Sequence, residues 1–107
     1  MAVLTAGRDA LVVQVRGELD LGTADRLMTK VEPLLTAGAV VVVDAALMPF
    51  MDSSGLRALL QSARLAADAG ATFRVAALGS AAARVVELAG VSGQLPVRRS
   101  VADALTG

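Results

Sequence analysis

The sequence predicts a single α/β domain built on a mixed, mostly parallel β-sheet with about four helices, in the order β-β-α-β-α-β-α-β-α. Short aliphatic runs alternate along the chain with longer stretches in which apolar residues recur at the helical period. The run 39–43 is aliphatic on both faces, which is typical of a strand in the middle of a sheet. A chain of 107 residues can bury one core, so we expect one domain over residues 1–107.

The chain is expected to open with a β-hairpin. Two aliphatic runs, 2–6 and 10–16, flank the turn-forming residues Gly7-Arg8-Asp9, and the second run is rich in β-branched side chains. Gly17 should close the second strand. The next residues, 18–22, then form a loop that leads into the first helix.

This first helix is expected to start after Thr23, which is a suitable N-cap. Apolar residues follow the helical period from Ala24 to Leu35, so one face should be buried. Pro33 removes a backbone donor and crowds the preceding turn. We therefore expect the helix to kink or to end near Glu32.

The run 39–43 is too short for a helix and is expected to be the central strand. Residues 44–49 should carry the chain out of the sheet, and a helix should cover 55–69. The residues expected on its buried stripe are Leu56, Leu59, Leu60, Ala63, Ala66 and Ala67. The residues expected on its opposite face are Arg57, Gln61, Arg64 and Asp68.

The last third of the chain repeats the alternation of strand and helix. Ser80 and Ser100 are expected to cap the two helices, and Gly90 should end the first of them. The second is short and should be stable only if it docks on the sheet. The expected elements are a strand over 72–77, a helix over 81–89, an edge strand over 97–98 and a terminal helix over 101–105.

The composition excludes several classes of function. Ten basic and ten acidic residues balance to a formal charge of zero, so we expect neither nucleic acid nor a membrane as a partner. The chain has no His and no Cys, which removes thiol chemistry, the common zinc sites and a Ser-His-Asp triad. No glycine motif for phosphate binding occurs, so we expect no enzymatic activity, no metal and no cofactor. The sequence lacks a signal peptide and a membrane-spanning apolar run, which favours a cytoplasmic protein.

The stretch just before the helix expected over 55–69 carries the chemistry that the sequence offers. Asp52, Ser53 and Ser54 stand where backbone N–H groups lack partners and the helix dipole favours an anion. Two interpretations stay open on chemistry alone: these side chains only cap the helix, or a serine is phosphorylated at a helix start that can hold the added charge. Arg57 follows one turn later, either as a counter-charge for a phosphoserine or as a solvated side chain.

Two motifs together resemble a known family. Gly17-Glu18-Leu19-Asp20 follows the second strand, and Phe50-Met51-Asp52-Ser53-Ser54-Gly55-Leu56 follows the third. They resemble the STAS domains of anti-sigma factor antagonists, and the resemblance covers essentially the whole chain. It implies that Ser53, the first serine of the Asp-Ser-Ser-Gly motif, is the phosphoacceptor. The residues expected to bind a partner are Asp20, Asp52, Ser53, Ser54, Gly55 and Arg57.

The resemblance also implies a cycle of partner switching. The unphosphorylated chain would bind an anti-sigma factor that is also a serine kinase, and so release a sigma factor. Phosphorylation at Ser53 would abolish this binding, and a PP2C-type phosphatase would restore the serine. The kinase rather than this chain would bind ATP, and we expect the chain to be a monomer or a weak dimer. The alternatives are a constitutive STAS interaction subunit, in a stressosome-like or transporter-associated complex, and an unrelated small-molecule binder.

Overall fold

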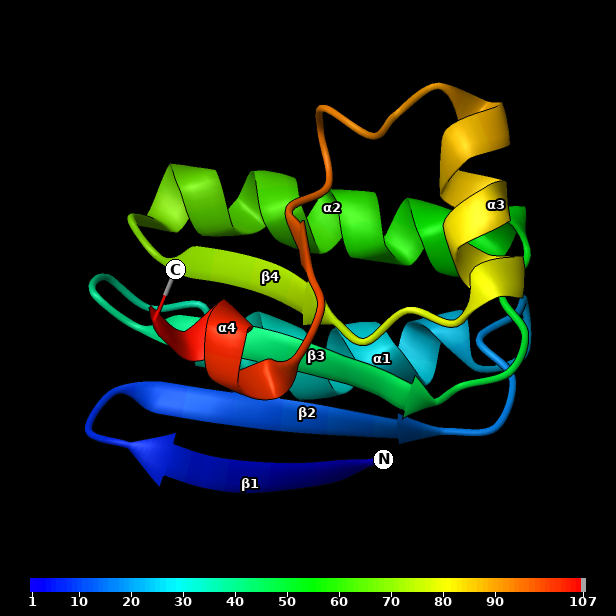
Figure 1. Ribbon diagram of the computed structural model, residues 1–107. Helices are drawn as coiled ribbons and strands as arrows, with labels where there is room; N and C mark the ends of the chain where they lie inside the picture. The colour runs from blue at the N-terminus through cyan, green and yellow to red at the C-terminus, as the bar shows by residue number, and fades with distance from the viewer. Residues whose placement is uncertain (107) are drawn as a thin grey trace.

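Five strands form one mixed sheet in the computed structural model, which describes residues 1–106 (Figure 1). In space they follow the order β1-β2-β3-β4-β5; β1 pairs antiparallel with β2, and each later pair is parallel. The expected hairpin and the mostly parallel sheet are therefore confirmed, while Gly107 lies outside the described residues. The strands are β1 (Ala2–Gly7), β2 (Ala10–Arg16), β3 (Val40–Leu47), β4 (Thr72–Ala76) and β5 (Val97–Arg98).

Helices make the crossovers between the parallel strands, as parallel pairing requires. Figure 1 shows α4 in front of the sheet and α1 behind it, with α3 standing across the end of α2. Within residues 1–106, no helix is both long and apolar enough to span a membrane. The helices are α1 (Ala24–Val31), α2 (Ser53–Ala69), α3 (Ser80–Ala89) and α4 (Val101–Thr106), with a short 3-10 helix, η1 (Glu32–Leu34), directly after α1.

β3 lies at the centre of the sheet because its side chains are buried on both faces. Val41 and Val43 belong to the larger core, which the sheet forms with α1, α2 and α3. Val42 belongs to a smaller core on the other face, where Ala104 of α4 covers it. Val41, Val42 and Val43 have no exposed surface. The strand therefore needs apolar residues at successive positions, as expected for a strand covered on both sides.

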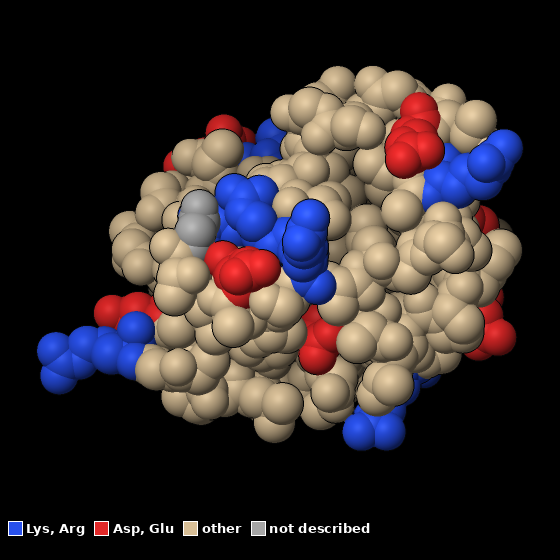
Figure 2. Space-filling view, in the orientation of Figure 1, with Lys and Arg blue, Asp and Glu red and all other residues tan. Residues whose placement is uncertain are grey.

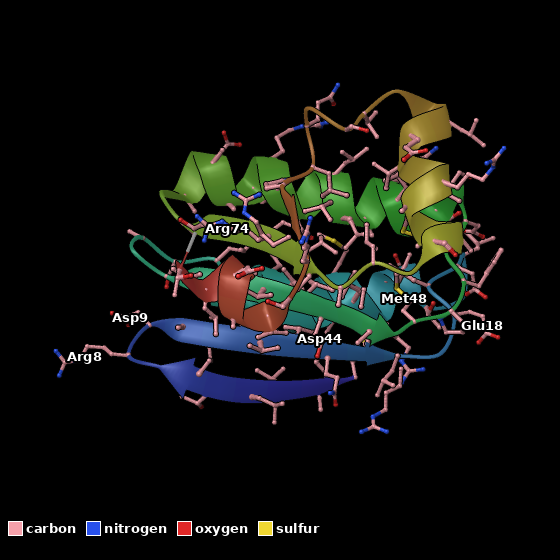
Figure 3. All side chains as sticks on the ribbon, viewed as in Figure 1. Arg8, Asp9, Glu18, Asp44, Met48 and Arg74 are labelled. Atoms are coloured by element: carbon pink, nitrogen blue, oxygen red, sulfur yellow. The ribbon has the colours of Figure 1, made fainter. Side chains whose placement is uncertain are left out.

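The short helix α4 is held on the sheet by two kinds of contact. Ala104 is fully buried against the smaller core. Arg74 of β4, labelled in Figure 3, donates from Nη1 to the Ala104 carbonyl at 2.6 Å, near the C-terminal end of α4 where a cation is favourable. At the other end, the Ser100 hydroxyl accepts from the Asp103 N–H at 3.1 Å, which confirms the expected cap.

Two predictions about element ends have different outcomes. Pro33 ends the first helix as expected, because α1 stops at Val31 and the chain tightens into η1. The central strand, by contrast, does not end at Val43 but runs to Leu47. Its pairing with β2 continues past a register shift, after which Arg16 lies opposite Leu47. The apolar pattern did not indicate this extension, because such a shift interrupts the regular alternation of side chains.

The predicted caps of α1 and α3 have different outcomes. Thr23 is the N-cap residue of α1 as expected, although its side chain makes no cap hydrogen bond and its backbone is helical. The cap predicted for α3 is wrong, because Ser80 is the first residue of the helix and Gly79 takes the cap position. The preference for Ser at a helix start did not specify which of two neighbouring residues is the cap.

The predicted buried stripe of α2 is partly wrong. Leu56, Leu59 and Ala66 are buried as expected. Leu60 and Ala63 are only partly buried, although both pack against the core, and Ala67 is exposed, because this side of α2 also borders surface hollows. The residues buried along α2 are Gly55, Leu56, Ala58, Leu59, Ser62 and Ala66.

Candidate functional site

Two loops that are distant in sequence meet at the start of α2. Leu19, after β2, and Met51, after β3, form an isolated parallel bridge. The Leu19 N–H donates to the Phe50 carbonyl at 3.0 Å, and the Asp52 N–H donates to the Leu19 carbonyl at 3.2 Å. Leu19 and Met51 are almost completely buried. The two motifs singled out in the sequence are therefore brought together through their backbones.

Asp52 is the N-cap of α2. Its backbone is extended, and its Oδ1 accepts from the Ser54 N–H at 2.9 Å and from the Gly55 N–H at 3.0 Å. These two donors have no partner within the helix, so the carboxylate satisfies them and also places a negative charge at the positive end of the dipole. The capping interpretation is thus correct for Asp52, and α2 begins at Ser53 rather than at Gly55.

Gly55 is required by a close approach between α2 and the Leu19 loop. A Cβ at this position would lie 2.3 Å from the Leu19 carbonyl oxygen and 2.9 Å from side-chain atoms of both Leu19 and Met51. The first of these atoms belongs to the backbone, so it cannot move aside by a change of rotamer. Sequence reasoning placed Gly55 in the motif but missed this role, because the neighbour comes from a distant loop.

Ser53 is the exposed serine of the pair. It is the first residue of α2, its side chain is exposed, and within residues 1–106 its hydroxyl makes no hydrogen bond. Ser54 is only partly exposed. The start of α2 therefore divides its tasks: Asp52 caps the helix, Gly55 permits the close packing, and the Ser53 hydroxyl remains accessible.

Asp20 has a structural role at the start of α1. Its Oδ1 accepts from the Gly22 N–H at 3.0 Å, and the Thr23 hydroxyl accepts from the Asp20 N–H at 2.9 Å. The same hydroxyl lies 2.9 Å from the Glu18 carbonyl and 3.1 Å from Asp20 Oδ1, and it can donate to one of them at a time. Asp20 is half-buried, so it shapes the turn that carries Leu19 while part of its carboxylate stays at the surface.

Arg57 lies between two hollows that flank the start of α2. A hollow of about 160 Å³ separates it from α1, and Asp25 lies on the α1 side of that hollow. A larger hollow of about 410 Å³ contains Ser53, Arg57 and Arg64 in its lining. The structure therefore places Ser53 and Arg57 along one surface, as the spacing of one helical turn predicts.

Exposed apolar side chains surround this site, and sequence reasoning did not identify them. Leu21 is 78% exposed, Phe50 is 49% exposed and Leu47 is 47% exposed. All three lie in or next to the two loops that meet at Leu19 and Met51. Phe50 could have been noticed in the sequence, because it is one of only two aromatic residues and is the first residue of the motif over 50–56. Such side chains favour contact with another protein.

Solved structures with the same fold include regulators and a transporter. An anti-sigma factor antagonist from Mycobacterium paratuberculosis is 28% identical, with a TM-score of 0.82, and the match covers 98% of this chain and 91% of that chain. The Bacillus cell fate determinant SpoIIAA in its phosphorylated form is 20% identical, with a TM-score of 0.71, over 96% of this chain and 94% of that chain. The murine anion transporter Slc26a9 is 17% identical, with a TM-score of 0.73, over 90% of this chain but only 17% of that chain.

The sequence itself matches one family model over nearly its full length. The model is that of the STAS domain, and it covers residues 2–104. This range includes both loops that meet at the start of α2 and all five strands. It also includes the helices, apart from the last two residues of α4. The chain therefore belongs to the STAS domain family.

Proposed function

We propose that this chain is an anti-sigma factor antagonist that is switched by phosphorylation at Ser53. The observation that carries the proposal is the division of tasks at the start of α2, where Asp52 holds the cap and the Ser53 hydroxyl is exposed without a hydrogen-bond partner in the described chain. A kinase can modify such a hydroxyl without breaking a contact that the fold needs. The similarity to the mycobacterial antagonist and to SpoIIAA, which has been solved in a phosphorylated form, supports the proposal.

In the unphosphorylated state, the chain binds an anti-sigma factor that is also a serine kinase, and the sigma factor is released. The contact surface comprises the exposed apolar side chains Leu21 and Phe50 and the polar start of α2. The proposed partner-binding residues are Asp20, Asp52, Ser53, Ser54, Gly55 and Arg57. Gly55 contributes indirectly, because it allows α2 to pack closely against the loop that contains Leu19.

The kinase ends the interaction by transferring the γ-phosphoryl group of its ATP to the Ser53 oxygen, with release of ADP. The phosphoserine adds about −1.5 to −2 charge beside the Asp52 carboxylate. A partner surface that accepts a neutral hydroxyl then meets like-charge repulsion and a desolvation cost. The cap is unaffected, so binding is lost without unfolding. A PP2C-type phosphatase hydrolyses the phosphoserine and restores the binding form.

In this scheme the chain is a binding protein rather than an enzyme. It needs no cofactor of its own, because its partners supply ATP binding and hydrolysis. We place the cycle in the cytoplasm, with the chain as a monomer or a weak dimer and with neither nucleic acid nor a membrane as a ligand. Because the chain has a formal charge of zero, we expect no net electrostatic attraction to nucleic acid or to an anionic membrane.

The assignment of Ser53 is tested by incubating the wild type and two variants with the cognate kinase and ATP, followed by intact-mass analysis and phosphopeptide mapping. The wild type and Ser54→Ala should each gain one phosphoryl group, on Ser53. Ser53→Ala should gain none and should remain bound to the kinase. Phosphate on Ser53→Ala, or a Ser54→Ala variant that cannot be modified, would overturn the assignment.

A second candidate function follows from the shared fold of the Slc26a9 transporter, in which a similar domain makes up part of a much longer chain. Here the chain would be a constitutive interaction subunit, and the Asp52-Ser53-Ser54 segment would serve only to start α2. The two candidates differ in one result. A constitutive subunit keeps its partner when Ser53 is replaced by Asp, whereas the switch releases it.

A further inference from the structure

A continuous groove runs along the side of α2 that faces away from α1. Three hollows of about 410, 300 and 360 Å³ lie in a row on this side. The first and second share Leu60 and Arg64, and the second and third share Ala63, Ala67 and Gln94. In Figure 1 the segment after α3 rises above α2 and then descends across it to β5. Val91, Gln94 and Pro96 of this segment line the hollows opposite α2. We call this feature the α2 groove.

The α2 groove has an apolar floor and basic walls. Its charged lining residues are Arg57, Arg64, Arg74 and Arg98, and no Asp or Glu of the described chain lines any of the three hollows. Its apolar lining consists mainly of small or aliphatic side chains from α2: Leu56, Leu60, Ala63, Ala66 and Ala67. Figure 2 shows basic side chains gathered near β4 and α4, where the far end of the groove lies. The chain as a whole has a formal charge of zero, whereas the charged residues that line this groove are arginines. Such a basic and apolar lining favours an acidic, aliphatic occupant.

The basic charge that is available to a ligand lies along the first hollow, with Arg57 one helical turn from Ser53 and Arg64 about three turns from it. Arg57 and Arg64 are exposed, and within residues 1–106 neither guanidinium makes a hydrogen bond or an ion pair. Arg74, at the far end, already donates to the Ala104 carbonyl. Ser53 lines the same hollow as Arg57 and Arg64.

The far end of the α2 groove offers backbone groups instead. β5 pairs with β4 only at Val75 and Ala76, so among the described residues no strand lies beside Thr72–Arg74 on that edge. The third hollow runs along this open stretch, which contributes Thr72, Phe73 and Arg74 to its lining. An open edge can pair with an extended segment of another chain. The groove spans about 20 Å from Ser53 to Ala67 along the helix axis. Roughly six or seven extended residues would fill it.

We propose that the α2 groove binds an extended, acidic and aliphatic segment of a partner protein, and that a phosphate on Ser53 competes with this segment for Arg57. The inference rests on the proposed function for the identity of the switch, and it adds the surface and the peptide chemistry that the switch controls. Phosphoserine would bring its oxygens within one helical turn of the unpaired Arg57 guanidinium group. It would therefore neutralise part of the charge that attracts the acidic segment, in addition to repelling it.

The groove is tested with synthetic probes and the full chain. The probe is a pool of eight-residue peptides in which Glu alternates with Leu, Val or Ala, and a control pool carries Gln in place of Glu. In titrations followed by amide and alanine-methyl NMR, the Glu pool should shift Leu60, Ala63, Ala67 and Gln94, and the Gln pool should bind more weakly. The double variant Arg57→Gln/Arg64→Gln should weaken the Glu pool by about tenfold. The matched variant Arg26→Gln, which removes an exposed arginine of α1 outside the groove, should not. Shifts confined to other surfaces, no shifts at all, or equal losses in the two variants would overturn the inference.

The link to the switch is tested without any kinase, by incorporating phosphoserine at position 53 during synthesis. The phosphorylated chain should bind the Glu pool about tenfold more weakly than the unmodified chain. Unchanged binding would contradict the competition between phosphate and peptide. Because this arm does not use the cognate kinase, the two proposals can fail separately. If no kinase modifies Ser53 but the peptide result holds, the proposed function is wrong and the groove stands; if the kinase modifies Ser53 but the peptides do not bind, the groove is wrong.

Discussion

At the scale of single residues, Gly55 shows how the motif depends on a contact that its own sequence does not contain. In the first turn of a helix, an Ala would ordinarily be the better residue, by up to about 1 kcal/mol. Here a Cβ would meet the Leu19 carbonyl oxygen at 2.3 Å, so either the loop or the helix start must move. The packing cost exceeds the gain in helix propensity, because overpacking against a fixed neighbour typically costs about 1–3 kcal/mol or more.

Gly55→Ala is therefore expected to lower the free energy of unfolding by about 2 kcal/mol. Urea denaturation followed by circular dichroism provides the measurement. Gly93→Ala is the matched control, since a Cβ at Gly93 would meet no atom within 4 Å and its backbone needs no glycine conformation. A Gly55→Ala variant as stable as the wild type would show that the two loops do not pack as closely as described.

Only some features of the Asp52-Ser53-Ser54-Gly55 segment could be predicted from its residue types. The Asp-Ser-Ser-Gly pattern correctly placed an acceptor and two hydroxyls at a helix start, because capping preferences are local. It could not rank Ser53 above Ser54 by exposure, since that depends on how α2 is rotated against the core. It also could not identify Leu21 and Phe50 as exposed neighbours, because aliphatic and aromatic residues in loops are more often buried.

At the scale of the secondary-structure elements, the start of α2 depends on Asp52 more than on either serine. Its Oδ1 satisfies two N–H groups that have no other partner in the helix. Asp52→Ala should therefore lower the free energy of unfolding by about 1 kcal/mol, within a range of about 0.5–2. Asp52→Asn keeps an acceptor of the same shape and loses only the charge at the helix end, worth about 0.5 kcal/mol.

Thermal unfolding of the two Asp52 variants separates the cap from the charge. Asn at this position should retain most of the melting temperature that Ala loses. Equal losses in both variants would mean that charge, rather than hydrogen bonding, stabilises the start of α2. Ser53→Ala should leave the melting temperature near that of the wild type, because its hydroxyl makes no hydrogen bond in the described structure.

The boundaries of secondary-structure elements could be predicted from the sequence where one residue determines where a helix starts or ends. Pro33 cannot continue a helix, and α1 ends just before it. Ser100 precedes a helix with no competing cap and holds it. By contrast, the extension of β3 to Leu47 depends on pairing with Arg16 across a register shift. No pattern within residues 44–47 specifies that partner, so the prediction from periodicity placed the end of the strand too early, at Val43.

At the scale of the whole molecule, the alternation of strands and helices was sufficient to predict a mostly parallel sheet that begins with an antiparallel hairpin, because crossover connections leave few arrangements. The site arises from this arrangement. Parallel strands β2 and β3 end at the same edge, and the loops after them meet at Leu19 and Met51. The α2 groove was not predictable, since it requires the segment after α3 to pass over α2. The helical period of α2 does not show this path, so Leu60, which lines the groove, was expected in the core.

The proposed anti-sigma switch depends on one local charge acting on an otherwise unchanged fold. A control for its measurement is phosphoserine placed at position 36 instead of 53. Thr36 is exposed and lies in the loop before Gly38, which bonds to Gly70 at the opposite end of α2. The same charge at this distant place should leave the affinity for the partner unchanged, so any loss seen at position 53 reports the site rather than net charge.

The most direct test is the affinity for the proposed partner, an anti-sigma factor kinase, measured by calorimetry with serine and with phosphoserine at position 53. We expect the Kd to rise by at least about 100-fold on phosphorylation, because repulsion and desolvation at the partner surface cost several kcal/mol. Circular dichroism should show both forms equally folded. Equal affinity of the two forms for the kinase would contradict the switch.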